Sequence, residues 1–427
     1  MNPRVAIIGS GISGLSCAHH LRGHADITLF EAGDYFGGHT HTVDVTLPTP
    51  QGRQTHGVDT GFLVFNERTY PGLIALLDEL QVPTAKSDMS FSVQAPQAHG
   101  QRTLEWNGST LNTVFAQRRN LFNPRFIGML REVVRFNTLV TELALRNHDE
   151  ELTQPLCEFL LANRFSEAFC DDYLLPMLGC IWSCPTDQML MFPVATMVRF
   201  CHNHGLAQVN NRPQWHTVRG GARHYVEKII AHIHDKRLNT PVHRIERDAQ
   251  GVTLHTAMGN ERFDAVVLAT HADQSLTMLA NPSQPEQRTL GAVRYHPNLA
   301  VLHTDASVMP QKKLAWAAWN YQRAEKQDTE NAQVCLHYWL NQLQPLPFTE
   351  NVFVSLNPIH EIDPKHVIGR YHYAHPVFDL AAIQAQSEMP ALQGQQHTWY
   401  AGAWMGYGFH EDGFKAGRAA ALGVLAR

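Results

Sequence analysis

The sequence has no apolar run of about twenty residues, the length that a helix needs to cross a bilayer, so we expect no transmembrane segment. It also lacks the apolar region of a secretory signal, because the short apolar run Val5–Ile8 is better explained as a strand. The formal net charge of −5 gives no basic excess, which argues against nucleic acid as a partner. These absences predict a cytoplasmic protein.

Motifs for metal binding and disulfide formation are also missing. The 7 cysteines have no regular spacing, which predicts no disulfide framework and a reducing compartment. The 26 histidines are scattered, with neither an HExxH motif nor paired CxxC motifs, so we predict no metal site. Cys180 and Cys184 could form a redox pair, but Pro185 and the apolar residues around them favour ordinary packing.

What the sequence does contain is a dinucleotide-binding fingerprint at its start. The strand-like run Arg4–Ile8 leads into Gly-Ser-Gly-Ile-Ser-Gly at residues 9–14 and then into a helical pattern. The glycines permit a tight turn, a close approach to a pyrophosphate and close helix–strand packing. A second strand-like run ends at Glu31, whose carboxylate can bind both hydroxyls of an adenosine ribose.

A second glycine pair, Gly37 and Gly38, follows Glu31 and Ala32 closely. With this pair the sequence resembles the FAD-binding amine oxidase and phytoene desaturase superfamily. The resemblance implies an α/β fold, in which a Rossmann-like FAD-binding domain of the GR2 type carries a parallel sheet and an inserted α+β substrate domain, with FAD bound non-covalently. His39 stands where the superfamily usually has arginine. A neutral histidine offers the pyrophosphate one N–H, whereas an arginine guanidinium offers several donors.

The second half of such a domain recurs late in the chain. Residues 241–271 are predicted to form strand, hairpin and strand, and residues 398–403 and 414–425 a last strand and helix joined by a loop. We therefore expect a discontinuous FAD-binding domain made of residues 1–66, 215–275 and 396–427. Residues 67–214 and 276–395 are expected to form the substrate domain, with a helical subdomain at about 110–205.

The fingerprint and the resemblance together predict the cofactor-binding residues. They are Gly9, Ser10, Gly11, Ser13, Gly14, Glu31, Ala32, Gly38, His39, Thr40, Thr60, Gly61, Phe62, Val242, Thr270, Gly402, Ala403, His410, Asp412 and Gly413. The superfamily usually has a carboxylate where this chain has Ala403, so a contact to the ribityl chain is missing or supplied elsewhere.

Aromatic residues alternate with polar ones at 316–321 and 335–341, a pattern typical of a sheet with one face on a large apolar pocket. Core packing would explain half of these residues equally well. Asn320, Tyr321 and Tyr338 are the predicted substrate contacts.

One branch of the superfamily fits the chain more closely. Residues 406–413 (Gly-Tyr-Gly-Phe-His-Glu-Asp-Gly), together with residues 59–62 and 319–321, resemble bacterial flavoproteins grouped with cyclopropane-fatty-acid synthases, including the desaturase of furan fatty acid synthesis. The resemblance implies removal of hydride from a (phospho)lipid acyl chain, with acyl-modifying enzymes as partners. His410 and Glu411 are the candidate proton acceptors, although both could simply cap the last helix.

Two other functions remain open from the sequence. An amine oxidase would often place a lysine at the flavin, but Lys312 and Lys313 lie in a predicted polar turn. A non-catalytic FAD-binding partner protein would carry the same fingerprint. Location is also open, because the helix predicted around residues 126–136 suits either a buried amphipathic helix with a basic edge or a helix against lipid head groups at the inner membrane.

Overall fold

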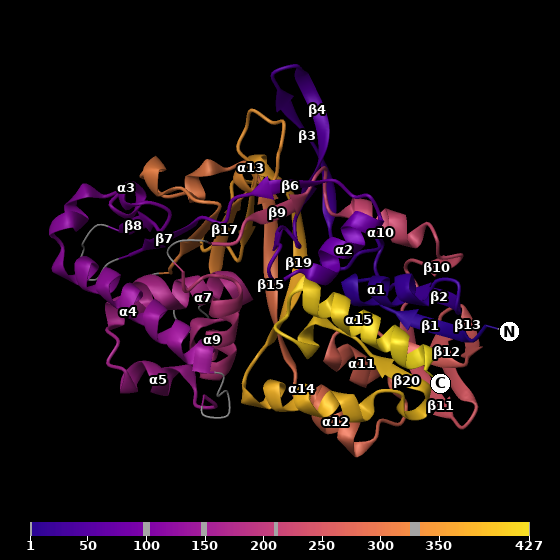
Figure 1. The fold of residues 1–427 in the computed structure, drawn as a ribbon. Helices are drawn as coiled ribbons and strands as arrows, with labels where there is room; N and C mark the ends of the chain where they lie inside the picture. Colours follow the sequence, from indigo (N-terminus) through magenta and orange to yellow (C-terminus); the bar gives the residue numbers. More distant parts are fainter. Residues whose placement is uncertain (1, 97–102, 147–151, 209–211, 325–333, 427) are drawn as a thin grey trace.

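The computed structural model describes residues 2–96, 103–146, 152–208, 212–324 and 334–426. A parallel five-stranded sheet has the strand order β10-β2-β1-β14-β20. Its strands are β1 (Arg4–Ile8), β2 (Asp26–Phe30), β10 (Asp235–Arg237), β14 (Ala265–Leu268) and β20 (Thr398–Tyr400). Strands from the start, middle and end of the chain therefore lie side by side (Figure 1).

Alternation along β1 directs side chains to both faces of this sheet. Val5 and Ile7 pack in one core with helices α1 (Ile12–Leu21), α2 (Pro71–Glu79), α10 (Arg223–Ile230) and α15 (His410–Leu425). Ala6 and Ile8 pack in a second core with α14 (Leu380–Leu392) and a small three-stranded sheet. The strands of this small sheet are β11 (Val242–Asp248), β12 (Gly251–Thr256) and β13 (Gly259–Phe263). Because both faces are covered, the central strands β1 and β14 are almost entirely apolar, as the sequence predicts.

A second, seven-stranded sheet has the order β19-β15-β18-β17-β16-β7-β8. Its strands are β7 (Phe91–Ala95), β8 (Leu104–Asn107), β15 (Arg294–His303), β16 (Trp319–Gln322), β17 (Cys335–Trp339), β18 (Phe353–Leu356) and β19 (Val367–Val377). The long strands β15 and β19 pair in antiparallel register and stand between the two halves of the molecule (Figure 1).

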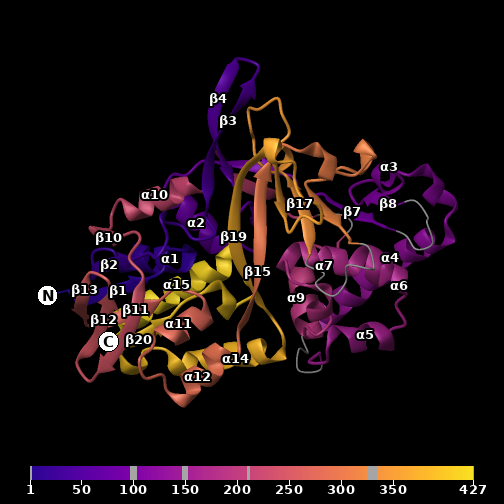
Figure 2. The ribbon, with the colours of Figure 1, turned by 180° about the vertical axis from the view of Figure 1, so that it is seen from behind.

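A helical lobe packs against this second sheet, as Figure 2 shows from behind. Its main helices are α4 (Pro124–Arg146), α5 (Leu156–Ala162), α7 (Leu175–Trp182) and α9 (Val194–Asn203). Among the helices that the structure describes, none combines the length and the apolar character needed to span a bilayer. The domain boundaries drawn from the sequence stay a prediction.

Candidate functional site

A cavity of about 410 Å³ lies where the parallel sheet meets the seven-stranded sheet and the helical lobe. Its wall at one end is formed by Gly9, Ser10 and Gly11 after β1, Glu31 after β2, and Thr270 after β14. Parallel strands bring their carboxyl ends to one edge of a sheet, and ligands bind outside that edge where the strand order reverses. The cavity therefore occupies the position at which such a fold binds a dinucleotide.

The three glycines of the fingerprint face different surroundings. Gly9 has a φ of +99°, and a Cβ there would lie 2.5 Å from the carbonyl oxygen of Ala269. A Cβ on Gly14 would lie 1.9 Å from the carbonyl oxygen of Gly9, so this glycine serves helix–strand packing. Around Gly11 nothing lies within 4 Å of such an atom, and Gly11 lines the cavity. An extended ligand can approach the backbone at this point.

The carboxylate of Glu31 is fixed in the cavity wall. Its Oε2 accepts hydrogen bonds from the Ser10 backbone N–H at 3.0 Å and from the Ser10 hydroxyl at 2.5 Å. Its Oε1 accepts from the Gly33 N–H at 2.8 Å. These bonds hold the carboxylate at the end of β2, where the fingerprint requires an acceptor for ribose hydroxyls.

Histidine side chains line the wall next to the glycine loops. The ring of His39 lies 5.3 Å from the ring of His375 and 6.5 Å from that of His271, and it stacks on Tyr373. Burial lowers the pKa of His375 to about 4 and lowers the pKa of His39 and His271 as well, so all three are neutral at pH 7.

Among the described residues, the buried Nε2 of His39 has no hydrogen-bond partner. It lies one residue beyond Gly38, whose Cβ would meet the Gly11 Cα at 3.1 Å. An unpaired buried imidazole nitrogen is costly, and a phosphate oxygen would satisfy it. The open backbone at Gly11, the Glu31 carboxylate and His39 together fit the diphosphate and ribose of FAD.

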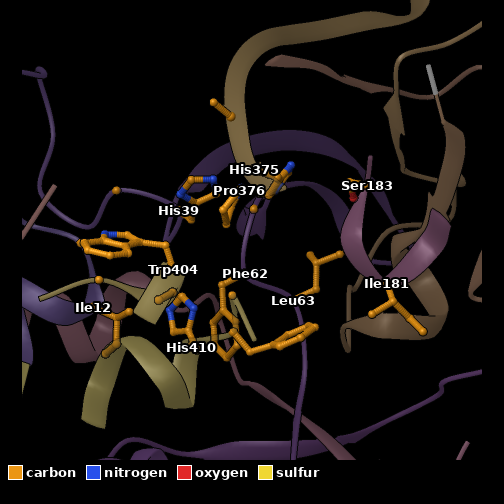
Figure 3. A pocket seen from close by; sticks show the side chains of 18 of the residues that line it. Ile12, His39, Phe62, Leu63, Ile181, Ser183, His375, Pro376, Trp404 and His410 are labelled. Atoms are coloured by element: carbon orange, nitrogen blue, oxygen red, sulfur yellow. The ribbon is translucent and has the colours of Figure 1, made fainter. Parts of the chain in front are cut away.

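His410 stands on the cavity wall under Phe62, and the two rings stack with centroids 3.6 Å apart (Figure 3). Its Nε2 lies 2.9 Å from the Thr40 hydroxyl and 3.1 Å from the Tyr225 hydroxyl. Burial lowers the pKa of His410 to about 3, so the ring is neutral at pH 7. Its orientation is therefore fixed by two hydroxyl groups and a stacking partner.

Helix α15 begins at His410, whereas the sequence placed residues 410–413 in a loop and the helix start at Phe414. The carboxylate of Asp412 accepts the Tyr407 and Phe409 N–H groups at 3.1 and 3.0 Å, which stabilises this earlier start. The Glu411 carboxylate accepts the Gly72 and Leu73 N–H groups at 3.0 and 2.9 Å at the start of α2. Glu411 is thus not among the residues that line the cavity.

The far end of the cavity is apolar. In Figure 3, Ile181 and Ser183 lie across from His410, beyond Leu63. Other residues of this end include Met89, Phe200, Trp319, Tyr338, Phe409 and Cys180. His204 also lines it and stacks on Phe200, and burial lowers the pKa of His204 to about 4, so this ring is neutral at pH 7. Cys180 and Cys184 form no disulfide, and burial raises the pKa of Cys180 well above its usual value, which suits packing. No Lys, Arg or Asp side chain lines the described cavity, and Glu31, at the opposite end, is its sole carboxylate.

Of the predicted substrate residues, Tyr338 alone lines the described cavity. Asn320 is buried, and its amide bonds to the carbonyls of Ala317 and His337 and to Ser92. Tyr321 is buried in the core of the helical lobe and sheet. As neighbours on β16, Asn320 and Tyr321 point to opposite faces of the sheet, and each packs in the interior. Trp319, which shares a face with Tyr321, lines the cavity instead.

The structure places the predicted cofactor residues in two groups. Those on the cavity wall are Gly9, Ser10, Gly11, Glu31, Gly38, His39, Gly61, Phe62, Thr270, Gly402, Ala403 and His410. Those behind the wall are Ser13, Gly14, Ala32, Thr40, Thr60, Val242, Asp412 and Gly413. Members of the second group support the first: Thr40 holds His410, and a Cβ on Gly413 would lie 2.7 Å from Ile12 Cγ2, so α15 packs closely on α1.

Many wall residues were missing from the predicted set, among them His271, His375 and Trp404. His375 lies on β19, where Tyr371, Tyr373 and His375 alternate with other residues at a period of two. That alternation was a readable signal of a strand with one aromatic face. The indole of Trp404 donates to the Thr270 carbonyl at 3.2 Å and lies beside Ile12 in Figure 3.

Comparison with known proteins places these features in context. Residues 12–338 match the family model described as flavin containing amine oxidoreductase. A Mycobacterium tuberculosis protein named as a flavin-containing monoamine oxidase is 25% identical over 295 residues, which is 66% of this chain and 60% of that protein. The match thus spans less than two thirds of that relative.

Two solved structures share the fold. Cyclohexylamine oxidase from Brevibacterium oxydans IH-35A superposes with a TM-score of 0.69 at 16% identity, covering 100% of this chain and 99% of the other. A fatty acid isomerase from P. acnes that produces CLA superposes with a TM-score of 0.67 at 16% identity, covering 98% and 97%.

Proposed function

Because the chain belongs to the flavin-containing amine oxidoreductase family, a family of FAD-dependent oxidoreductases, we propose that it removes hydride from a hydrophobic substrate, namely a (phospho)lipid acyl chain. Bound FAD supplies the hydride acceptor for such a reaction. The residues of this chain bind the cofactor, hold the substrate carbon beside it and exclude water. We also propose that the chain falls in the branch of the family that is grouped with cyclopropane-fatty-acid synthases. Its partners would then be acyl-modifying enzymes.

The observation that carries the proposal is the composition of the far end of the cavity. Ile181, Trp319 and Tyr338 offer apolar surface, and no charged side chain lies among the described residues there. An ammonium substrate brings a charge whose desolvation no carboxylate at this end would offset. An acyl chain gains free energy from burial in proportion to its apolar area. The fatty acid isomerase has the same fold, which is therefore compatible with an acyl-chain ligand.

The proton that leaves with the hydride needs an acceptor, and the two candidates differ in geometry. His410 lines the cavity, whereas both Glu411 oxygens accept backbone N–H groups of α2. We therefore prefer His410. Because burial lowers its pKa to about 3, the His410 ring is neutral at pH 7, and one of its two nitrogens can accept a proton. It is a weak base until a partner stabilises the imidazolium.

An anaerobic absorbance titration of the purified flavoprotein tests the proposal. Phospholipids with unsaturated or methylated acyl chains are expected to bleach the flavin band. Bleaching by amines alone would replace the proposal with an amine oxidase. Bleaching by neither, with FAD bound, would favour a non-catalytic FAD-binding protein.

A cavity-filling variant sharpens this test. Ile181→Trp is expected to slow flavin reduction by the lipid at least tenfold, because an indole would occupy the space assigned to the acyl chain. FAD absorbance should stay normal, since Ile181 lies far along the cavity from the glycine loop, as the labelled residues of Figure 3 indicate. Ile181→Val is the matched control and should reduce at the parental rate. Equal rates for both variants would place the substrate elsewhere.

A further inference from the structure

Two sequence segments at the outer edge of the helical lobe contain basic residues and no acidic ones. Between Trp106 and Arg131 the sequence has 4 arginines and no aspartate or glutamate. Between residues 306 and 322 it has 2 lysines and again no acidic residue. The whole chain, by contrast, has a formal charge of −5. Positive charge is therefore concentrated in two segments that are far apart in sequence.

The fold brings these two segments together. Helix α3 (Leu111–Val114) packs against the short helix η5 (Lys313–Ala315), which also contacts β8. A surface hollow beside them is lined by Arg118, Arg119 and Lys312. Its one acidic residue, Glu105, is buried and accepts the backbone N–H groups of Gln311 and Lys312. The cationic side chains thus dominate the exposed part of the hollow.

Large apolar side chains surround the hollow and face solvent. Phe122 is 89% exposed, Leu111 79%, Leu121 47% and Leu314 37%. Phe122 and Leu121 end the short helix η1 (Arg118–Phe122), directly before α4. We call this surface the basic tip, and it consists of Leu111, Leu121, Phe122, Leu314, Arg118, Arg119, Lys312 and Lys313. In Figure 1, α3 and the start of α4 mark its position, at the opposite end of the molecule from β12 and β13.

We propose that the basic tip docks the protein on an anionic lipid bilayer. Exposed phenylalanine and leucine beside arginine and lysine form the combination that inserts at the boundary between head groups and acyl chains. The hollow between Arg118, Arg119 and Lys312 presents cations to a lipid phosphate. Because neither sequence segment contains an acidic residue, neither would repel the negatively charged surface of the bilayer.

The tip is built on the strands that carry the substrate end of the cavity. Strand β8 pairs with β7, and β7 pairs with β16, on which Trp319 lines the cavity. Docking through the tip would therefore bring the lobe that holds the cavity to the lipid phase. This inference does not depend on the proposed function, because bilayer binding is measured without turnover.

Sedimentation of the intact flavoprotein with lipid vesicles tests the inference. We expect the protein to bind vesicles of phosphatidylglycerol and phosphatidylcholine mixed, and to bind pure phosphatidylcholine at least tenfold more weakly. Added salt should weaken the binding, because it screens attraction to anionic head groups. Equal binding to both vesicle types, or no binding to either, would overturn the inference.

Variants locate the binding on the molecule. Lys312→Gln with Lys313→Gln is expected to lower the partition coefficient about fivefold per charge removed. Leu121→Ser with Phe122→Ser should lower it at least tenfold, even in low salt. The matched controls are Lys228→Gln with Lys236→Gln for charge and Met258→Ser, 75% exposed in the parent, for apolar exposure. Normal flavin absorbance shows that each variant is folded, and equal losses in tip and control variants would contradict docking through the tip.

Discussion

At the scale of single residues, two glycines of the same motif differ in what a side chain would meet. A Cβ at Gly11 meets nothing within 4 Å, while a Cβ at Gly14 meets the Gly9 carbonyl oxygen at 1.9 Å. The backbone of Gly11 has φ −65° and ψ 177°, which any residue adopts. A side chain at Gly11 would therefore leave the fold intact, but it would project into the cavity and occupy space that the cofactor needs.

We predict that Gly11→Val gives a folded protein without flavin, because its side chain would fill the space above the helix start. Gly14→Val, in contrast, should fail to fold, because it would push α1 off β1. Absorbance at the flavin band and circular dichroism of the two purified variants distinguish these outcomes. Full flavin occupancy in Gly11→Val would refute the placement of the cofactor.

Individual site residues could be predicted from the sequence where the backbone or the ligand permits only one type of residue. The fingerprint glycines and Glu31 are of this kind, since turn geometry and ribose binding restrict the choice. His271 and His375 are not, because an imidazole suits many environments and only the pairing of β19 beside β15 brings His375 near His39. Asn320 and Tyr321 were selected by their chemistry, but the Asn320 amide bonds to backbone carbonyls and Tyr321 packs in the core, so neither reaches the cavity.

At the scale of elements, the first turn of α15 joins two helices. Glu411 is 4% exposed, and its two oxygens accept the N–H groups of Gly72 and Leu73 at the start of α2. A carboxylate at a helix N-terminus satisfies unpaired donors and interacts with the positive end of the helix dipole. The sequence could not reveal this contact, because 338 positions separate Glu411 from Leu73.

We predict that Glu411→Ala lowers the free energy of unfolding by about 2–4 kcal/mol, because two buried N–H groups lose their acceptor. Glu411→Gln should lose less, since its carbonyl oxygen can still accept one of them. Urea unfolding measures both losses. Flavin reduction in the folded fraction should be unchanged in either variant, and a slower reduction with normal stability would instead assign Glu411 to proton transfer.

The predicted elements were most accurate where local periodicity is strong. Strands β1, β2 and β14 and helix α1 lie where the sequence indicates them. Strands β15 and β19, which position His375 and Tyr373, were not predicted. The alternation of aromatic residues along β19 was a readable signal, whereas β15 has no regular alternation and contains Pro297, so that its strand signal is weak until it pairs with β19.

At the scale of the whole molecule, the second sheet contains a buried network of neutral imidazoles. The Ser355 hydroxyl lies 2.6 Å from both His303 Nε2 and His337 Nδ1, and His337 Nε2 lies 2.9 Å from Gln322 Oε1. His337 must donate to Gln322 and therefore accepts from Ser355 through Nδ1, while Ser355 accepts from His303. The arrangement is satisfied only when both rings are neutral.

Burial lowers the pKa of His303 to about 4 and that of His337 to about 3. Both values lie below the value of about 6.5 expected in the unfolded chain. The unfolded state therefore binds more protons than the folded state at acidic pH. Stability from these groups is complete above about pH 6.5 and is lost as the pH falls toward 4.

Two carboxyl groups have the opposite effect on how stability depends on pH. Burial raises the pKa of Asp59 and of Asp412 to about 6, so the folded state takes up protons on them between about pH 6 and 4. Three further buried histidines, His204, His375 and His410, have pKa values lowered to about 4, 4 and 3 by burial. Burial also lowers the pKa of His39 and His271, so the imidazoles outnumber the two carboxyls and the net effect of acid is a loss of stability.

We predict that the free energy of unfolding, measured in urea, falls steadily from pH 7 to pH 4.5. Each neutral buried histidine should contribute about 2–3 kcal/mol of that fall. His303→Gln removes one titrating group but keeps a donor for Ser355, so it should lower stability at pH 7.5 and reduce the dependence on pH. Should this variant be too unstable for urea titration, the imidazole resonances of the parent protein can be followed by NMR, where His337 is expected to stay neutral down to about pH 4. An unchanged pH dependence in the variant, or a His337 that titrates near 6.5, would show that this network is not a source of acid sensitivity.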